Sequence, residues 1–102
     1  MTPNQIDEAV ATEVMGYPSS LRPTQHGGAV RFSPSTDIAA AWRVVEKFVS
    51  REIRFSCIDD HKYKYAEFFS IEDGKRLGDA TELQSLPLAI CLAALQAVRS
   101  KQ

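Results

Sequence analysis

Hydrophobic positions recur with a helical period in three segments of the chain, and the most complete is 87–98, P-L-A-I-C-L-A-A-L-Q-A-V. This segment is apolar on nearly every side, and such a helix is either buried or spans a membrane. Its twelve residues fall short of the roughly 20 that a membrane span needs. We therefore expect a helix that packs against other elements on more than one side, with Ser85 as its cap.

An amphipathic helix is predicted near the N-terminus, from about Pro3 to Met15. Thr2 and Gln5 form a T-x-x-Q capping box at its start, and Gly16 supplies a left-handed stop at its end. Its apolar stripe follows helical spacing and consists of Ile6, Ala9, Val10 and Val14.

A second amphipathic helix is predicted from its cap at Ser35 or Thr36 to about Ser50. Arg43 falls on its polar side. Its apolar stripe is wide and bulky, and consists of Ile38, Ala41, Trp42, Val45, Phe48 and Val49. The stripe predicts a core position for Trp42, and the alternative is a ring exposed at an interface, where tryptophan is enriched.

The pattern changes to a period of two in the middle of the chain. Residues 52–57 alternate, 62–71 are rich in aromatic residues, and a short strand returns over 75–78 after the Asp73-Gly74 turn. Connections this short require an antiparallel sheet. The Phe68-Phe69 pair places one ring on each face, so we expect both faces to be covered.

These elements predict a single globular domain over 1–102 of the α+β class. A sheet with helices on both faces is a three-layer α/β/α sandwich. We expect three helices and a small antiparallel sheet of three to four strands.

The segment from Tyr17 to Ser35 has no clear period, apart from a short strand at 29–32 in which Val30 and Phe32 would face the core. Loops this long are uncommon in compact domains and are often functional. This one combines basic side chains, flexible glycines and backbone donors near the start of a helix, which suits an anion or an acidic partner. The predicted ligand- or partner-binding residues are Arg22, His26, Gly27, Gly28, Arg31, Ser35 and Thr36, and the alternative is a loop without function.

Composition narrows the function classes. The formal net charge is −1, from 12 basic and 13 acidic residues, which argues against a nucleic-acid binder and against an acidic mimic of DNA.

The first residues lack the basic and apolar regions of a signal peptide, which predicts a cytosolic protein without a membrane segment. Cys57 and Cys91 are interpreted as reduced thiols of the core, with a disulfide as the alternative.

The sequence holds few residue clusters or motifs that indicate catalysis. The Asp59-Asp60-His61 cluster is interpreted as a solvated turn, because three consecutive residues rarely converge on one metal ion. The chain lacks the glycine-rich phosphate-binding motifs and the G-x-S-x-G motif. We therefore expect no enzyme, no cofactor and no metal, and the alternative is a minimal hydrolase that uses His61 or Cys57.

Three blocks of sequence carry a resemblance to a known family: V-M-G-Y-P at 14–18, S-T-D-I-A-A-A-W-R-V-V-E-K at 35–47, and the apolar run at 87–98. In this order and spacing they resemble the phage ABA sandwich domain, a family of small phage and prophage proteins. The resemblance covers nearly the whole chain and agrees with the three-layer fold. It implies an accessory protein in the cytoplasm of the infected or lysogenic bacterial host, and it assigns no site residues.

The expected function is therefore non-enzymatic binding of a host or phage protein through the loop 18–34, with a counter-defence role as its extension by analogy. One alternative is an oligomer that sequesters a nucleotide between loops bearing Arg22, His26 and Arg31. Another is a structural or accessory component of the virion. A homodimer would bury any apolar surface that the last helix leaves over.

Overall fold

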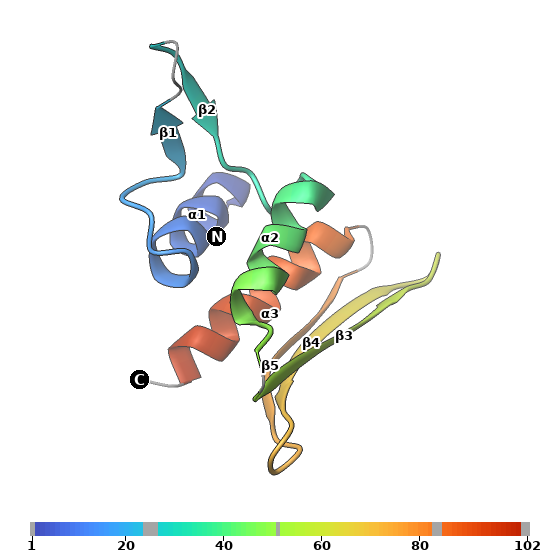
Figure 1. The fold of residues 1–102 in the computed structure, drawn as a ribbon. Coiled ribbons are helices and arrows are strands. Elements are labelled where there is room, and N and C mark those ends of the chain that lie inside the picture. The colour runs from blue at the N-terminus through green and yellow to red at the C-terminus, as the bar shows by residue number, and fades with distance from the viewer. Residues whose placement is uncertain (1, 24–26, 51, 83–84, 101–102) are drawn as a thin grey trace.

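The computed structural model describes residues 2–23, 27–50, 52–82 and 85–100, with the side chains of residues 22 and 23 outside the description. The elements follow one another along the chain and are labelled in Figure 1. They are α1 (Pro3–Ala9), the π-helical segment η1 (Val10–Val14), β1 (Leu21–Pro23), β2 (Ala29–Arg31), α2 (Ile38–Phe48), β3 (Ile53–Asp59), β4 (Lys64–Ser70), β5 (Arg76–Glu82) and α3 (Leu86–Ser100).

Strands β3, β4 and β5 form the predicted antiparallel sheet, in that order. Phe55 lies opposite Phe68, which lies opposite Gly78 on the next strand. Gly74 turns the chain between β4 and β5 with a φ of 69°, as the Asp-Gly signal predicts. The last strand was predicted over 75–78, but β5 continues to Glu82. Its residues 79–82 pair with β4, although they lack a clear alternating pattern.

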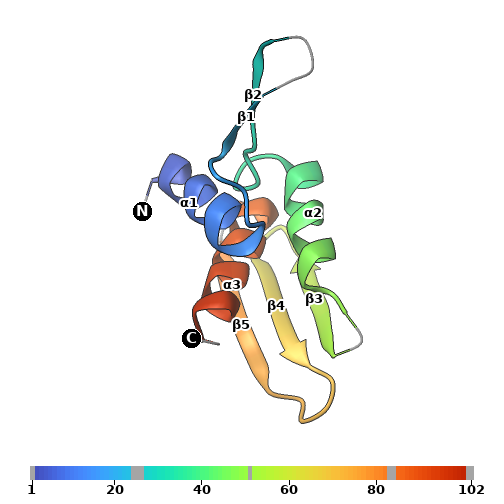
Figure 2. The same cartoon turned by 60° about the vertical axis from the view of Figure 1, so that its left-hand side comes forward.

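The α+β class is confirmed, because the described residues form three α-helices, the segment η1, this three-stranded antiparallel sheet and a separate pair of strands, β1 and β2. The helices lie at increasing distance from this sheet. Helix α3 lies on β4 and β5, α2 lies beside α3 and reaches β3, and α1 with η1 packs on α3 from the side away from the sheet (Figures 1 and 2).

We expected a helix on each face of the sheet, and the described helices all lie on one side of it (Figure 1). The other face is polar enough to contact water, as one face of an antiparallel sheet commonly does. Glu67 lies at its centre and accepts hydrogen bonds from Tyr65 Oη at 2.9 Å and Arg76 Nε at 3.0 Å. Phe69 lies on this face opposite Arg54 and is half-buried without a helix above it.

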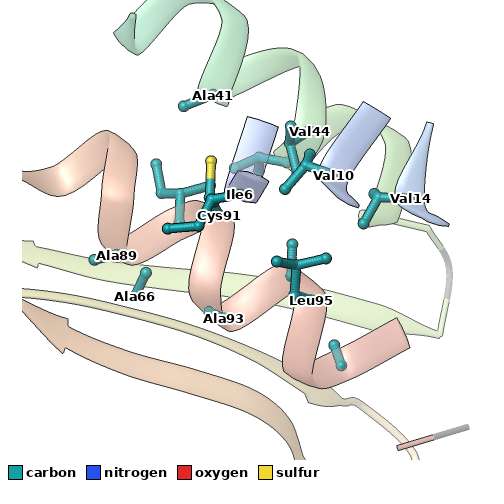
Figure 3. Packing of buried hydrophobic residues seen from close by; sticks show 14 of the residues in the cluster. Ile6, Val10, Val14, Ala41, Val44, Ala66, Ala89, Cys91, Ala93 and Leu95 are labelled. Carbon is teal, nitrogen blue, oxygen red and sulfur yellow. The ribbon is translucent and has the colours of Figure 1, made fainter. Parts of the chain in front are cut away.

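Helix α3 is buried on two sides, as its all-round apolar pattern predicts. Figure 3 shows Cys91 pointing toward the side of Ile6 and Leu95 pointing toward that of Val10 and Val14, while Ala93 points toward the sheet. Small residues on the sheet side let the helix backbone approach β5 closely. Ser85 Oγ accepts a hydrogen bond from Leu88 N at 3.2 Å, which confirms the predicted cap.

Gly78 is the strand residue that makes this approach possible. A Cβ atom at this position would collide with the carbonyl oxygen of Ala93 and would lie 2.6 Å from the amide nitrogen of Ala97. Both atoms belong to the backbone of α3, so they cannot rotate away. The contact between α3 and β5 therefore requires glycine here.

The N-terminal helix has the predicted capping box. Gln5 N donates to Thr2 Oγ1 at 3.2 Å, and Thr2 N donates to Gln5 Oε1 at 2.8 Å. The α-helix ends at Ala9, the chain continues as η1 to Val14, and Gly16 then turns it with a φ of 74°. The predicted apolar stripe faces the core through Ile6, Val10 and Val14.

Helix α2 differs from its predicted orientation. Its cap is Asp37, whose Oδ1 accepts from Ala39 N at 3.0 Å, rather than Ser35 or Thr36. Its most buried positions are Ala40, Ala41, Val44 and Val45. The core assignment of Trp42 is wrong, because this side chain is 41% exposed. The predicted stripe is wider than the contact with α3, so its edge packs only partly, through an edge-to-face contact of Trp42 with Phe55 at 5.7 Å.

Candidate functional site

The segment predicted as a functional loop contains a β-hairpin that projects from the rest of the molecule (Figures 1 and 2). Strands β1 and β2 pair antiparallel, with Leu21 opposite Arg31. The prediction that Val30 faces the core is wrong, because it is 59% exposed, and Leu21 is 52% exposed. The strands extend beyond the helices, so a core exists only at the base of the hairpin, where Phe32 is buried as predicted.

Two consecutive carboxylates of α1 hold the two ends of this hairpin. Glu8 Oε2 accepts from Ser20 N at 3.0 Å and from Ser20 Oγ at 2.6 Å, just before β1. Asp7 Oδ1 accepts from Ser35 N at 2.8 Å in a buried contact, after β2. The hydrogen bonds from Ser20 hold the pKa of Glu8 below its usual value.

Further contacts stiffen the base of the hairpin. Phe32 N donates to Ser20 O at 2.6 Å, and Tyr17 N donates to Ala11 O at 2.8 Å. The rings of Tyr17 and Phe32 meet edge to face with centroids 5.5 Å apart. The direction of the hairpin is therefore fixed by α1, by η1 and by a small aromatic contact.

The predicted site residues divide between the hairpin and its base. Arg22 lies in β1, but its side chain and all of His26 lie outside the described residues. Gly27 has a φ of 82°, which an L side chain rarely adopts, and Gly28 follows it before β2. Arg31 is exposed on β2.

The two predicted hydroxyl residues lie where the chain leaves the hairpin. Thr36 is exposed and Ser35 is buried. Ser35 Oγ has no hydrogen-bond partner among the described residues. The Ser35 backbone therefore anchors the hairpin, while its hydroxyl does not reach the surface.

A cavity of about 350 Å³ lies where the hairpin meets the start of α2. It brings Arg31 of the predicted site together with Arg43, which the sequence pattern places simply on a solvent-facing side of its helix. No sequence spacing signals this pair, because their proximity depends on the direction of the hairpin. The cavity is lined by Tyr17, Val30, Arg31, Phe32, Asp37, Ala40 and Arg43.

The groups with catalytic potential lie away from this cavity. Cys57 and Cys91 are free thiols, and burial raises the pKa of both, which disfavours the nucleophilic thiolate. His61 is exposed in the β3–β4 turn, with Nδ1 3.3 Å from Asp60 Oδ1. Within the described ranges, no three His, Cys, Asp or Glu residues are grouped to hold a metal ion. None of the helices described has both the length and the apolar character that crossing a membrane requires.

Comparisons with known proteins agree with this fold. The crystal structure of a phage protein from Bacillus cereus ATCC 14579 superimposes with a TM-score of 0.69 at 23% identity, covering 97% of this chain and 89% of that one. None of the curated proteins matches the chain. The family model of the phage ABA sandwich domain matches residues 8–95. This match spans all the elements from η1 to β5 and most of α3, and the chain therefore belongs to the phage ABA sandwich domain family.

Proposed function

We propose that this protein is a non-enzymatic accessory protein of a phage or prophage that binds a host or phage protein through its projecting hairpin. The observation that carries the proposal is a hairpin fixed at both ends by Glu8 and Asp7 whose described strand side chains are exposed. A loop that served only to connect α1 with α2 would not need such an extension. Rigid scaffolds that present exposed segments are a common arrangement for binding.

Apolar exposure supports recognition of a protein surface. Leu21 and Val30 are 52% and 59% exposed. Leu21 lies opposite Arg31 and Val30 opposite Arg22, so each face of the hairpin carries one of these apolar residues. Burying such side chains against a partner removes apolar surface from water, which favours association. Preformed strands also lose less conformational entropy on binding than a flexible loop would.

Charge indicates the chemistry of the partner. The sequence from Met15 to Thr36 holds two arginines and no acidic residue, whereas the whole chain has a net charge of −1. The hairpin is therefore the basic part of an otherwise acidic molecule. We expect it to contact an acidic surface with an apolar centre, because complementary charge speeds association and excludes wrong partners. We extend the proposal, by analogy with other phage accessory proteins, to a host defence component in the bacterial cytoplasm.

The proposal is tested by affinity capture from the bacterial host at native expression, with the full chain and two matched variants. Leu21→Ser removes an exposed apolar side chain from the hairpin, and Ile58→Ser removes one, 44% exposed, from the far side of the sheet. We expect one partner to be captured by the wild type and by Ile58→Ser, and to be lost with Leu21→Ser. Capture that is unchanged in Leu21→Ser, or absent from the wild type, would contradict the proposal.

A further inference from the structure

The cavity at the base of the hairpin points to a ligand as well as a protein partner. We propose that it binds a nucleoside monophosphate, with the phosphate between Arg31 and Arg43 and the nucleobase against Tyr17 and the apolar wall. The cavity shares Val30 and Arg31 with the hairpin surface proposed to bind a protein, whereas Leu21 does not line it, so a Leu21 variant tests the two proposals separately.

The two arginines are available to a ligand. Two other arginines are paired with carboxylates within the chain: Arg99 Nε lies 2.9 Å from Glu13, and Arg76 Nε lies 3.0 Å from Glu67. Among the described residues, no carboxylate lies within ion-pair distance of Arg31 or Arg43, and the longer-range attraction between Arg31 and Glu8 is a minor cause of the lowered pKa of Glu8. Two such guanidinium groups on one cavity favour a phosphate, whose oxygens accept several charge-assisted hydrogen bonds.

The acidic side chain on the cavity is already engaged. Asp37 Oδ1 accepts the hydrogen bond from Ala39 N at 3.0 Å that starts α2. Its charge is thereby directed to the helix terminus, where a carboxylate is stabilised by the helix dipole. The lining still carries two cations against one anion, so it attracts a negatively charged ligand.

The rest of the lining suits a flat apolar body. Tyr17 and Phe32 are held edge to face at 79°, and Val30 and Ala40 complete the wall. The volume of about 350 Å³ lies near the lower end of the roughly 300–1,000 Å³ found for small-molecule sites. An inorganic anion would leave this wall unused, and a ligand much larger than a mononucleotide would extend into solvent.

The test is isothermal titration calorimetry of the full chain with AMP, GMP, CMP and UMP, and separately with inorganic phosphate and with adenosine. We expect at least one mononucleotide to bind more tightly than phosphate or adenosine alone. Arg43→Gln should weaken that binding by about tenfold to a hundredfold, since it removes hydrogen bonds to a charged group. Lys47→Gln removes one positive charge one turn further along α2, outside this cavity, and should leave the affinity unchanged.

Circular dichroism melting checks that each variant is folded. Arg43→Lys, which retains the charge, should bind with intermediate affinity. The proposal is overturned if no mononucleotide binds at millimolar concentration, if phosphate binds as tightly as every mononucleotide, or if Lys47→Gln lowers the affinity as much as Arg43→Gln. Leu21→Ser should bind the nucleotide like the wild type, so loss of the protein partner and loss of the ligand are separate results.

Discussion

Helix α3 and the β1–β2 hairpin are opposites within one small molecule. Seven of the 15 residues of α3 are buried between the sheet and the other helices, whereas all three residues of β2 are exposed. The helix therefore contributes mainly to the stability of the fold. The hairpin adds little to the core, and its residues can be selected for binding without loss of the fold. Substitutions that are costly in one region should be tolerated in the other.

The strongest test of the helical region is Gly78→Ala. The added methyl group would collide with the backbone of α3 at Ala93 and Ala97, which cannot be relieved by a change of rotamer. We expect a loss of more than about 4 kcal/mol in the free energy of unfolding, which leaves much of the chain unfolded. Urea denaturation followed by circular dichroism measures the effect.

Gly74→Ala is the control for this substitution. No atom lies within 4 Å of a Cβ at Gly74, and its φ of 69° leaves only backbone strain, about 1 kcal/mol. Equal losses from the two substitutions would show that α3 does not approach β5 as closely as the structure indicates.

The same substitution in both regions sharpens the comparison. Leu95→Ala should cost about 3 kcal/mol, because Leu95 is 3% exposed and its removal leaves a cavity beside Val14. Leu21→Ala should change the free energy of unfolding by less than about 0.5 kcal/mol, because Leu21 is 52% exposed. Denaturant midpoints measure both, and a large loss from Leu21→Ala would mean that the hairpin packs on the core.

Much of the helical region was predictable because its signals are local. The apolar run at 87–98 and the alternation at 52–57 each report burial from a few consecutive residues. The capping box of Thr2 and Gln5 is likewise a contact three residues apart. Which side of the sheet each helix covers is not a local property, so the sequence pattern of Phe68 and Phe69 did not determine it.

The hairpin and its cavity could not be predicted from such local signals. Each strand has only three residues, and their direction is set by contacts with Asp7 and Glu8, which are 28 and 12 positions from their partners in the sequence. A carboxylate early in a helix is ordinarily explained by the helix dipole, which hides its role as an anchor. The position of Arg43 on the cavity and the exposure of Trp42 both depend on how α2 is rotated about its own axis. A wide apolar stripe does not determine that rotation.

The buried anchor of the hairpin connects the two regions and gives an intermediate effect. Asp7→Ala removes the acceptor for Ser35 N and leaves this amide buried and unpaired, at a cost of about 2 kcal/mol. Asp7→Asn keeps an oxygen at this place and should cost less. Chemical denaturation with hydrogen exchange of the Ser35 amide measures both. Equal costs for the two variants would mean that the charge of Asp7, not its hydrogen bond, holds the hairpin.

The exposed anchor gives the smallest effect, and it depends on pH. Hydrogen bonds from Ser20 lower the pKa of Glu8 below its usual value of 4.5, so the ionised carboxylate stabilises the folded hairpin base. This contribution is complete above the pKa of the unfolded chain and is lost as the pH falls through the lowered folded value. The Ser20 amide donates to Glu8 directly, so its protection against hydrogen exchange should fall over that acidic range.

Glu8→Gln keeps an acceptor oxygen but cannot ionise, so Ser20 should lose the part of its protection that depends on pH. Asp73→Asn is the matched control, since Asp73 also has a lowered pKa but lies in the β4–β5 turn. It should leave the profile of Ser20 unchanged, whereas any general loss of stability in acid, such as that from the Glu13–Arg99 pair, affects all the variants alike. If wild type and Glu8→Gln lose Ser20 protection in parallel as the pH falls, Glu8 does not hold the hairpin, and the rigidity on which its binding role depends must come from Asp7 and the aromatic base alone.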